Sequence, residues 1–454
     1  MFDKHSLTYK VRHLSPAKLL LLFYFIAIIL STLVLSLPIV YQEGVEVPFI
    51  DILFTAVSAL SVTGLSTISI ADTFSTIGII VLAIILQLGA VGVMTVSTFI
   101  WLLLGKKIGL SERRLIMQDQ NQTTFGGIVA LIKQILVVVL IIEVLGFLIL
   151  GTYFLRYFPT PLEAYYNGFF STISAISNGG FTLKSQSLAL YKDDYFVQLF
   201  MMLFVIFGAI GFPVLIEVKQ FLLTKRKRKW PFRFSLFTKV TTSTFFALVV
   251  LGAAFIYLMD ANGFFKGKNW HESIFYALFQ SITTRSAGLS TMDVSLLTDS
   301  NHLFMSFLMF IGASPSSAGG GIRTTTFALV LIFIITYARG GKKVKVFNRE
   351  IYDEDLLKAV TITILAIGLV FITLLILSFT EPFSMTALIF EVTSAFGTVG
   401  LSLGITSELS AFSKILLMML MFIGRIGLVT FLFSFRDDTH HDSIHYPKER
   451  IIIG

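Results

Sequence analysis

The stretch "FGTVGL" (Phe396–Leu401) interrupts an apolar run with two glycines and a threonine, and no polar loop surrounds it. Three other segments end in the same way, with a glycine followed by Leu or Phe: "TAVSALSVTGL" (55–65), "STISAISNGGF" (171–181) and "QSITTRSAGL" (280–289). The four final glycines are 116, 108 and 112 positions apart: Gly64, Gly180, Gly288 and Gly400. This register predicts a chain built from four internal repeats.

A second motif follows each of these glycines, and its first glycine lies 24 to 28 residues further on. Its four copies are "QLGAVG" (87–92), "IFGAIG" (206–211), "FIGASP" (310–315) and "FIGRIG" (422–427). One short match means little in a chain with 33 glycines. Two motifs matched in register four times indicate quadruplication of one ancestral segment.

The composition is that of a membrane protein. Of the 454 residues, 55% are hydrophobic and 14% are charged, whereas soluble domains carry about 25% charged residues. Apolar runs long enough to span a bilayer recur along the chain: 19–37, 79–104, 135–155, 197–216, 240–259, 359–379 and 411–435. The chain has no cysteine, which excludes disulfides, thiolate metal sites and cysteine nucleophiles.

The basic residues mark one side of the membrane. Of the 35 Lys and Arg residues, 26 fall in five segments: 1–18, 105–133, 219–239, 339–358 and 436–454. Acidic residues predominate in the pieces between them. Basic loops stay in the cytoplasm, so both termini are expected there. The densest run, "TKRKRKW" (224–230), fits a topology signal at an anionic lipid surface better than a nucleic-acid patch.

The lengths predict the topology of one repeat. A spanning helix is followed by about a dozen moderately apolar residues that end at the glycine, such as 50–62. As a helix this piece reaches about 18 Å, roughly half the bilayer core, and a second span then returns the chain. We therefore expect an all-α integral membrane protein with four tandem helix–pore-helix–helix repeats around a pseudo-fourfold pore. This gives eight membrane spans and four re-entrant half-helices, with repeats at 1–116, 117–230, 231–345 and 346–454.

The four glycine motifs are the candidate functional site. Irregular backbone at membrane depth is tolerated only where it lines a water-filled path or is buried in protein. Rings of backbone carbonyls that replace a hydration shell form cation filters. Each glycine alone could equally be a tight turn or a helix-packing contact, but four in register favour a filter. The expected filter residues are Val62, Thr63, Gly64, Asn178, Gly179, Gly180, Ser286, Ala287, Gly288, Thr398, Val399 and Gly400.

These motifs resemble the Trk/Ktr/HKT superfamily of potassium transporters, most of all the bacterial Ktr-type membrane subunit, over about residues 15–454. The resemblance implies one filter glycine from each repeat, and glycine at all four positions implies potassium selectivity. It further implies a homodimer in the bacterial plasma membrane, with one pore per protomer and a cytosolic nucleotide-binding ring (RCK/KTN type) as regulator at the basic face. The chain has no G-x-G-x-x-G fingerprint, so we expect no cofactor here and any nucleotide on that partner.

The third repeat departs from its siblings after Gly312. It reads "GASPSSAGGGIRTTT" (312–326) where the other repeats are expected to continue as helix. A fully helical 302–337 would be about 54 Å long, beyond a core of about 30 Å, and three consecutive glycines with a proline break helices. The alternative is a simple packed kink. The resemblance implies an intramembrane gating loop made of Gly312, Ala313, Ser314, Pro315, Ser316, Ser317, Ala318, Gly319, Gly320, Gly321 and Arg323.

Two arginines stand out in the apolar background. Arg425 occupies the position at which the other repeats have alanine, near the middle of a predicted span. A charge at that depth costs at least about 2.5 kcal/mol, so it is expected to face a cavity or a partner. Arg425 has either a structural role, paired with Glu143 or bonded to loop carbonyls, or a functional role as a positive barrier that tethers the gate. The two roles are compatible. Arg285 is expected to brace the filter through hydrogen bonds to neighbouring loops.

Three other classes of protein fit less well. A cation-coupled secondary solute symporter commonly has inverted repeats, whereas these four run the same way. A voltage-gated channel needs an arginine-rich sensor helix, and a membrane enzyme needs a cluster of acids, bases or nucleophiles. The sequence shows neither pattern. The sequence therefore predicts potassium uptake through a channel-like pore gated by a cytosolic partner, and leaves the dependence on sodium open.

Overall fold

The structure is a computed structural model that describes residues 15–103, 108–119, 127–184, 187–224 and 232–434, with Glu449 and Ile451. Within these residues the regular secondary structure is helical apart from one antiparallel hairpin, β1 (Lys345–Val346) and β2 (Arg349–Glu350), and an isolated bridge between Tyr41 and Phe74. Short 3-10 turns occur at Pro38–Val40, Ala189–Tyr191, Val294–Leu296 and Thr406–Glu408. Most of the basic run 224–230 lies outside the described residues.

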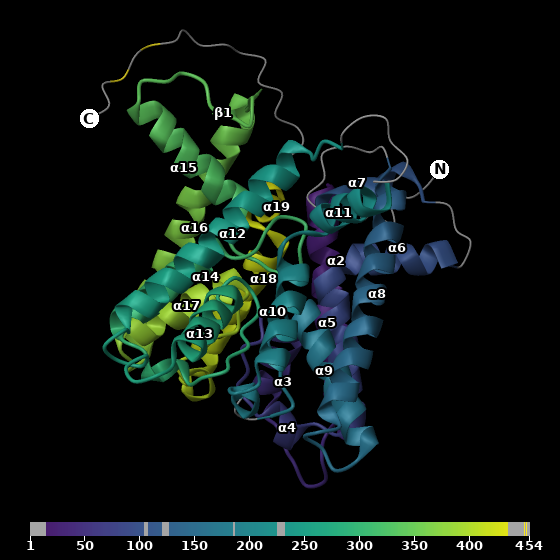
Figure 1. The fold of residues 1–454 in the computed structure, drawn as a ribbon. Helices are drawn as coiled ribbons and strands as arrows, with labels where there is room; N and C mark the ends of the chain where they lie inside the picture. The colour runs from purple at the N-terminus through teal and green to yellow at the C-terminus, as the bar shows by residue number, and fades with distance from the viewer. Residues whose placement is uncertain are drawn as a thin grey trace, which may run out of the picture.

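The same order of elements recurs four times: a long helix, a short helix, and a pair of helices (Figure 1). We call these units 1 to 4. Unit 1 contains α2 (Pro16–Leu35), α3 (Phe49–Leu60), α4 (Ile70–Thr73), α5 (Thr76–Val91) and α6 (Val93–Leu103), and α7 (Leu110–Asp119) leads to unit 2. Unit 2 contains α8 (Ile128–Phe154), α9 (Pro161–Ile176), α10 (Tyr195–Ala209) and α11 (Phe212–Thr224).

Units 3 and 4 follow the same order. Unit 3 contains α12 (Leu236–Met259), α13 (Trp270–Thr283), α14 (Asp299–Ile311) and α15 (Thr324–Ala338), and the β-hairpin follows it. Unit 4 contains α16 (Asp353–Thr380), α17 (Met385–Gly397), α18 (Ala411–Ile426) and α19 (Leu428–Ser434). The expected repeat boundary at 116/117 falls within α7 and that at 345/346 within β1, so the boundaries stay predictions.

Local sequence explains where many of these helices begin. Serine precedes the first residue of several, and its hydroxyl accepts a hydrogen bond from a backbone N–H of the first turn. This is seen at Ser75 before α5, Ser235 before α12, Ser384 before α17 and Ser410 before α18. The helices then continue because their residues are almost uniformly apolar.

The first helix of each unit presents an apolar surface to the outside of the bundle. Large apolar side chains are exposed there, for example Phe25 on α2, Leu140 on α8, Val250 on α12 and Phe371 on α16. Among the described residues, these four helices are the single helices long and apolar enough to cross a membrane. An exposed apolar belt of this size fits contact with lipid.

In units 1, 2 and 4 the predicted second span is wrong as a continuous helix. We expected only the third repeat to break, but α5/α6, α10/α11 and α18/α19 also separate at a single glycine: Gly92 (φ +96°), Gly211 (φ +101°) and Gly427 (φ +93°). A left-handed φ ends the helical hydrogen-bond ladder, and glycine adopts it without steric cost. The break in unit 2 bends the chain by 107°, so α11 lies across the end of the bundle (Figure 1).

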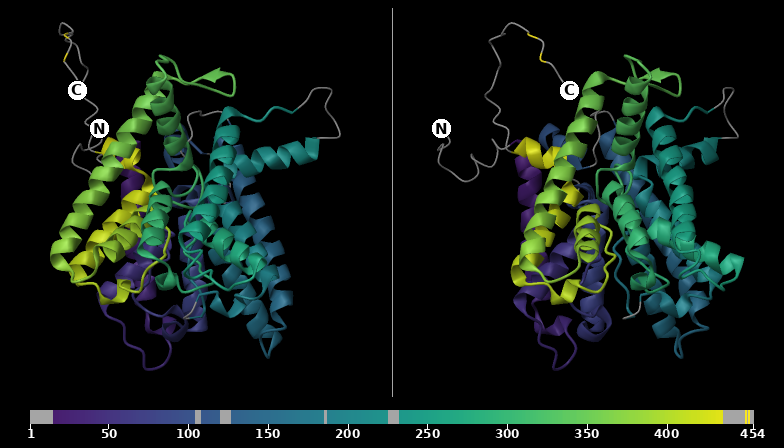
Figure 2. Two further views of the ribbon diagram at one scale, coloured as in Figure 1. Left: turned by 60° about the vertical axis from the view of Figure 1, so that its left-hand side comes forward. Right: turned by 90° about the vertical axis from the view of Figure 1, so that its left-hand side faces the viewer.

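The units pack in a closed cycle. The second helix of each unit contacts the short helix of the next: α5 with α9, α10 with α13, α14 with α17, and α18 with α3. The cycle closes between units 4 and 1, which lie side by side in Figure 2. There Lys414 Nζ is 2.8 Å from Asp51 Oδ1 in a buried ion pair. The short helices are therefore held inside the bundle, and each points its C-terminal end into a glycine motif.

Candidate functional site

The four motif glycines all adopt left-handed backbone: Gly64 (φ +89°), Gly180 (φ +69°), Gly288 (φ +65°) and Gly400 (φ +92°). Three residues that lie two positions before them also have positive φ: Val62 (57°), Asn178 (56°) and Thr398 (49°). Non-glycine residues adopt this conformation rarely, and such strain concentrates at functional sites. The four turns therefore share a defined backbone conformation, strained in three of them, which ordinary loops lack.

The structure brings these glycines together. A Cβ atom added to any one of them would collide with backbone of a neighbouring unit. The contacts run in cyclic order: Gly64 with Gly179, Gly180 with Ala287, Gly288 with Val399, and Gly400 with Thr63. We call Gly64, Gly180, Gly288 and Gly400 the glycine ring. All twelve predicted filter residues belong to the four turns that form it.

Polar residues of the short helices fix these turns. The N–H of Gly64 donates to Ser58 Oγ (3.1 Å), and that of Gly400 donates to Ser394 Oγ (3.0 Å). In unit 2, Ser174 Oγ donates to the Phe181 carbonyl at 2.6 Å. Sequence analysis did not single out these serines, although each stands six positions before its glycine. That shared spacing was the available signal.

Arg285 does not brace the glycine ring as expected. Its side chain is completely buried, and none of its three guanidinium nitrogens has a hydrogen-bond partner among the described residues. The guanidinium carbon lies 5.6 Å from the centre of the Phe245 ring, which fits a cation–π contact. The expectation failed because the preceding turn directs the side chain towards α12 rather than towards the neighbouring turns.

Residues 312–323 form an irregular segment between α14 and α15, which we call the glycine-rich segment. It passes against the glycine ring. Val62 packs in one cluster with Ala318, Ser286 Oγ lies against Gly319, and Thr398 Oγ1 lies against Gly320. The helix break predicted here is confirmed. The break is a long, largely buried irregular segment rather than a simple kink.

The break in unit 2 holds the other side of this segment. The N–H groups of Ser314 and Ala318 donate to the carbonyls of Ala209 and Gly208, both at 3.0 Å. The N–H of Phe212 donates to the Ser316 carbonyl at 2.8 Å. The bend between α10 and α11 thus supplies backbone groups that a continuous helix would have used internally.

Arg425 clamps the glycine-rich segment to unit 1. Its guanidinium donates to the carbonyls of Ser317 (3.2 Å) and Ala318 on one side. On the other side it donates to those of Gly89 and Ala90 (2.8 Å) in α5. Loop carbonyls were one of the expected partners, and they are found.

The other expected partner, Glu143, is not found. Its carboxylate accepts a hydrogen bond from Gln87, and no ion pair joins it to Arg425 among the described residues. Glu143 and Arg425 meet different residues of α5, Gln87 in one case and the carbonyls of Gly89 and Ala90 in the other, which depth in the membrane does not reveal.

Arg323 holds the segment from within. It donates to the Gly319 carbonyl and to the Ser314 carbonyl at 3.2 Å, and it reaches the carbonyl of Arg425 at 3.4 Å. Its own φ is +78°, and Ser316 (φ +54°) is the other non-glycine residue of the segment with left-handed backbone. Two arginines are therefore fixed to one short piece of backbone.

An acidic residue that sequence analysis missed faces both arginines. Asp119, at the end of α7, lines an enclosed cavity of about 20 Å³ with Arg323 and Arg425, large enough for a water molecule. Tyr24 donates to Asp119 Oδ1 at 3.3 Å. Burial raises the pKa of this carboxyl from 3.8 to about 6, while Arg425 acts in the opposite direction. Its position depends on how α7 folds back, which no local pattern encodes.

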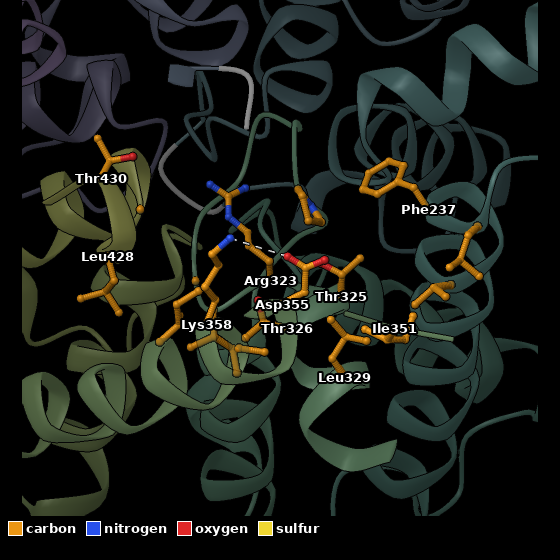
Figure 3. A pocket seen from close by; sticks show the side chains of 18 residues that line it. Phe237, Arg323, Thr325, Thr326, Leu329, Ile351, Asp355, Lys358, Leu428 and Thr430 are labelled. Atoms are coloured by element: carbon orange, nitrogen blue, oxygen red, sulfur yellow. Dashed lines mark ion pairs between the residues drawn. The ribbon is translucent and has the colours of Figure 1, made fainter. Parts of the chain in front are cut away.

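A larger cavity of about 470 Å³ lies on the other side of the glycine-rich segment. It is bounded by α12, α15, α16 and α19, and Figure 3 shows its lining. Most of the lining is apolar, but Arg323, Lys358 and Asp355 project into it, and Lys358 Nζ is 3.7 Å from Asp355 Oδ1. Within the described ranges, no group of three or more His, Cys, Asp or Glu residues could hold a resident metal.

An apolar helical bundle with irregular backbone gathered in its interior fits an integral membrane protein in which that backbone is buried in protein or lines a water-filled path. The family model described as "Cation transport protein", TrkH, matches residues 14–444. The chain belongs to this family of ion transporters.

Known relatives match along almost the whole chain. The Ktr system potassium uptake protein D of Bacillus subtilis is 56% identical over 444 residues, which cover 98% of each chain. The Ktr system potassium uptake protein B of the same organism is 34% identical, covering 97% of each. The Potassium/sodium uptake protein NtpJ of Enterococcus hirae is 29% identical, covering 98% of each.

A solved structure has the same fold. The potassium transporter TrkH from Vibrio parahaemolyticus superposes with a TM-score of 0.73. The match covers 94% of this chain and 86% of that one, at 18% identity.

Proposed function

We propose that this protein takes up potassium across the bacterial plasma membrane through the centre of the glycine ring. The observation that carries the proposal is the cyclic contact of four left-handed glycine turns, each at the end of a short buried helix. Relatives named as potassium uptake proteins support the choice of ion.

The ring is the proposed selectivity filter. Its backbone carbonyls replace part of the hydration shell of the ion, and the C-terminal ends of four short helices add partial negative charge. Each unit contributes one glycine rather than a long stack of carbonyls. We therefore expect one or two well-defined potassium sites and weak entry of sodium.

The glycine-rich segment is the proposed gate. It passes directly against the ring, and the two arginines hold it through backbone carbonyls of the segment and of α5. Arg425 also places a positive charge close to the path, which would slow cations while the segment is closed. Displacing the segment requires these hydrogen bonds to be exchanged.

The proposed topology counts each broken pair as one crossing, which gives eight spans and four re-entrant half-helices around a pseudo-fourfold pore. The basic segments then place both termini in the cytoplasm. The resemblance to Ktr-type subunits implies a homodimer embedded in lipid and a cytosolic nucleotide-binding ring as regulator. A cation-coupled solute symporter is the alternative, and the cyclic packing of units does not favour it.

Uptake by living cells tests this function. The chain, expressed with a matching regulatory subunit in bacteria that lack their own potassium uptake, should restore growth at low potassium. Rubidium should compete with potassium, and sodium should compete poorly. Growth that is not restored, with the protein present in the membrane, would overturn the proposal and reopen the symporter alternative.

A further inference from the structure

The residues two positions before the ring glycines lie where the ring meets the glycine-rich segment. Ser286 and Thr398 face the adjacent residues Gly319 and Gly320 of that segment, while Val62 packs with its Ala318. Three of the four units thus place this residue on the segment. The side chain two positions before the ring glycine therefore differs chemically from unit to unit, whereas the glycine itself is the same in all four.

Only two of these positions carry free polar groups. The hydroxyls of Ser286 and Thr398 are completely buried and have no hydrogen-bond partner within the described part of the chain. In unit 2, the side-chain amide of Asn178 is already used: in the orientation that gives both its atoms complementary partners, its NH₂ donates to the carbonyls of Ala175 (3.1 Å) and Val205 (3.2 Å). In unit 1, Val62 is apolar. The free oxygens therefore come from the neighbouring units 3 and 4.

Buried hydroxyls without partners are uncommon, because each gives up its hydrogen bonds to water. Two such hydroxyls face one pair of glycines, which indicates a site for a ligand that is coordinated by oxygen atoms. Hydroxyl and carbonyl oxygens are the ligands that hard monovalent cations accept from proteins, and this position adjoins the ring.

We propose that Ser286 Oγ and Thr398 Oγ1 form an inner coordination site for the permeating monovalent cation, on the side of the ring that faces the glycine-rich segment. The inference rests on the proposed function and adds specificity-determining residues to it. The ion that leaves the ring meets these two oxygens before it leaves the protein.

The glycine-rich segment caps this site in the present structure. A Cβ atom at Gly320 would lie 2.6 Å from Thr398 Oγ1, and one at Gly319 would overlap Ser286 Oγ. Only glycine lets the segment approach the two hydroxyls so closely. Displacement of the segment therefore opens the path and uncovers the site in the same movement.

The test is rubidium flux in liposomes that contain the full-length protein, with the regulatory subunit supplied. Flux is measured against potassium concentration and against competing sodium for wild type, Ser286→Ala, Thr398→Val and the double variant. Thr398→Ser keeps the hydroxyl. Thr393→Val is the matched control, because that hydroxyl lies in α17, the short helix that ends just before Thr398, but bonds to the Ile389 carbonyl at 2.8 Å.

We expect Ser286→Ala and Thr398→Val each to raise the half-saturating potassium concentration by about threefold to tenfold, the effect of one lost polar contact. Sodium should compete better in both, while Thr398→Ser and Thr393→Val stay at wild-type values. Wild-type flux with unchanged potassium affinity and sodium competition in the double variant would overturn this inference alone. A wild type without flux would overturn the proposed function as well. If Thr398→Val lowers the melting temperature, Ser286→Ala, which removes a single oxygen atom, decides the question.

Discussion

At the scale of single residues, the ring glycines meet two separate requirements. Each has a positive φ, and each leaves no room for a Cβ atom beside the backbone of the next unit. Gly404 separates the two requirements, since its φ is +91° but open space surrounds the position of its Cβ atom. The chain thus supplies its own control for the effect of backbone strain.

Gly400→Ser should lower the affinity for potassium, because its side chain would displace the Thr63 carbonyl from the ring. We expect the half-saturating potassium concentration in uptake assays to rise by about tenfold, equivalent to about 1.4 kcal/mol. Gly64→Ser should act in the same direction. Gly404→Ser introduces the same strain outside the ring and should leave uptake kinetics unchanged. Unchanged kinetics in both ring variants would remove the glycines from the path.

Arg425→Ala should increase potassium leak in the absence of the regulator. The substitution leaves the carbonyls of Ser317 and Ala318 without their charged donor, and such hydrogen bonds are worth about 1.5–3 kcal/mol each. Leak is measured as rubidium efflux from liposomes, with the melting temperature recorded in parallel. Lower stability with normal leak would make Arg425 a purely structural residue.

The effect of pH on leak should depend on Asp119. Because its pKa is raised to about 6, the carboxyl is charged at pH 7.5 and mostly protonated at pH 5.5. Protonation removes the negative charge that offsets Arg425, so acidification should loosen the segment and raise leak. Asp119→Asn should leak at both pH values, and Glu112→Gln on the same helix should behave as wild type. Leak that rises equally on acidification in wild type and Asp119→Asn would contradict this role.

The sequence predicted residues of the ring better than their partners. The four glycines could be identified from their register, because a shared backbone conformation imposes the same residue four times. Asp119 and the direction of Arg285 could not, since each depends on how an irregular connection folds back. Sequence left Glu143 and loop carbonyls open as partners of Arg425, because depth in the membrane does not specify the face of a helix; the carbonyls are the partners found.

At the scale of elements, the breaks in the second helices are the main difference between expectation and structure. The motifs "QLGAVG", "IFGAIG" and "FIGRIG" share their last glycine, and that glycine is the break in each. A single glycine in a strongly apolar helix is usually tolerated, so the motif alone predicts a continuous helix. At Gly92 and Gly211 a Cβ atom would also meet Asp119 and the Pro315 carbonyl, so a larger residue would be obstructed at these two breaks, whereas open space surrounds that position at Gly427.

Gly319→Ala tests how closely the glycine-rich segment must approach the ring. Its methyl group would overlap Ser286 Oγ, so the segment cannot occupy the present position. We expect raised rubidium leak without the regulator and little change in maximal flux with it. Gly368→Ala in α16, where the added methyl meets open space, is the control and should be neutral. A tight, regulator-dependent Gly319→Ala protein would show that the segment does not close the path at this point.

At the scale of the whole molecule, the proposed ion path depends on one property, the cyclic packing of four units that carry the same turn. The order of contacts follows from four units that run in the same direction, which the sequence repeats already indicated. The contact between units 4 and 1 that closes the cycle could not be predicted from the repeats, because it depends on tertiary packing. The buried ion pair of Lys414 and Asp51 lies there.

The most direct measurement is the anomalous scattering of rubidium in crystals of the protein grown with rubidium in place of potassium. We expect one or two anomalous peaks of rubidium on the axis of the glycine ring, at coordination distance from the carbonyls of Thr63, Gly179, Ala287 and Val399. These peaks should weaken in Gly400→Ser crystals. Rubidium bound elsewhere in the bundle, with an empty ring, would contradict the claim that the ions pass through it.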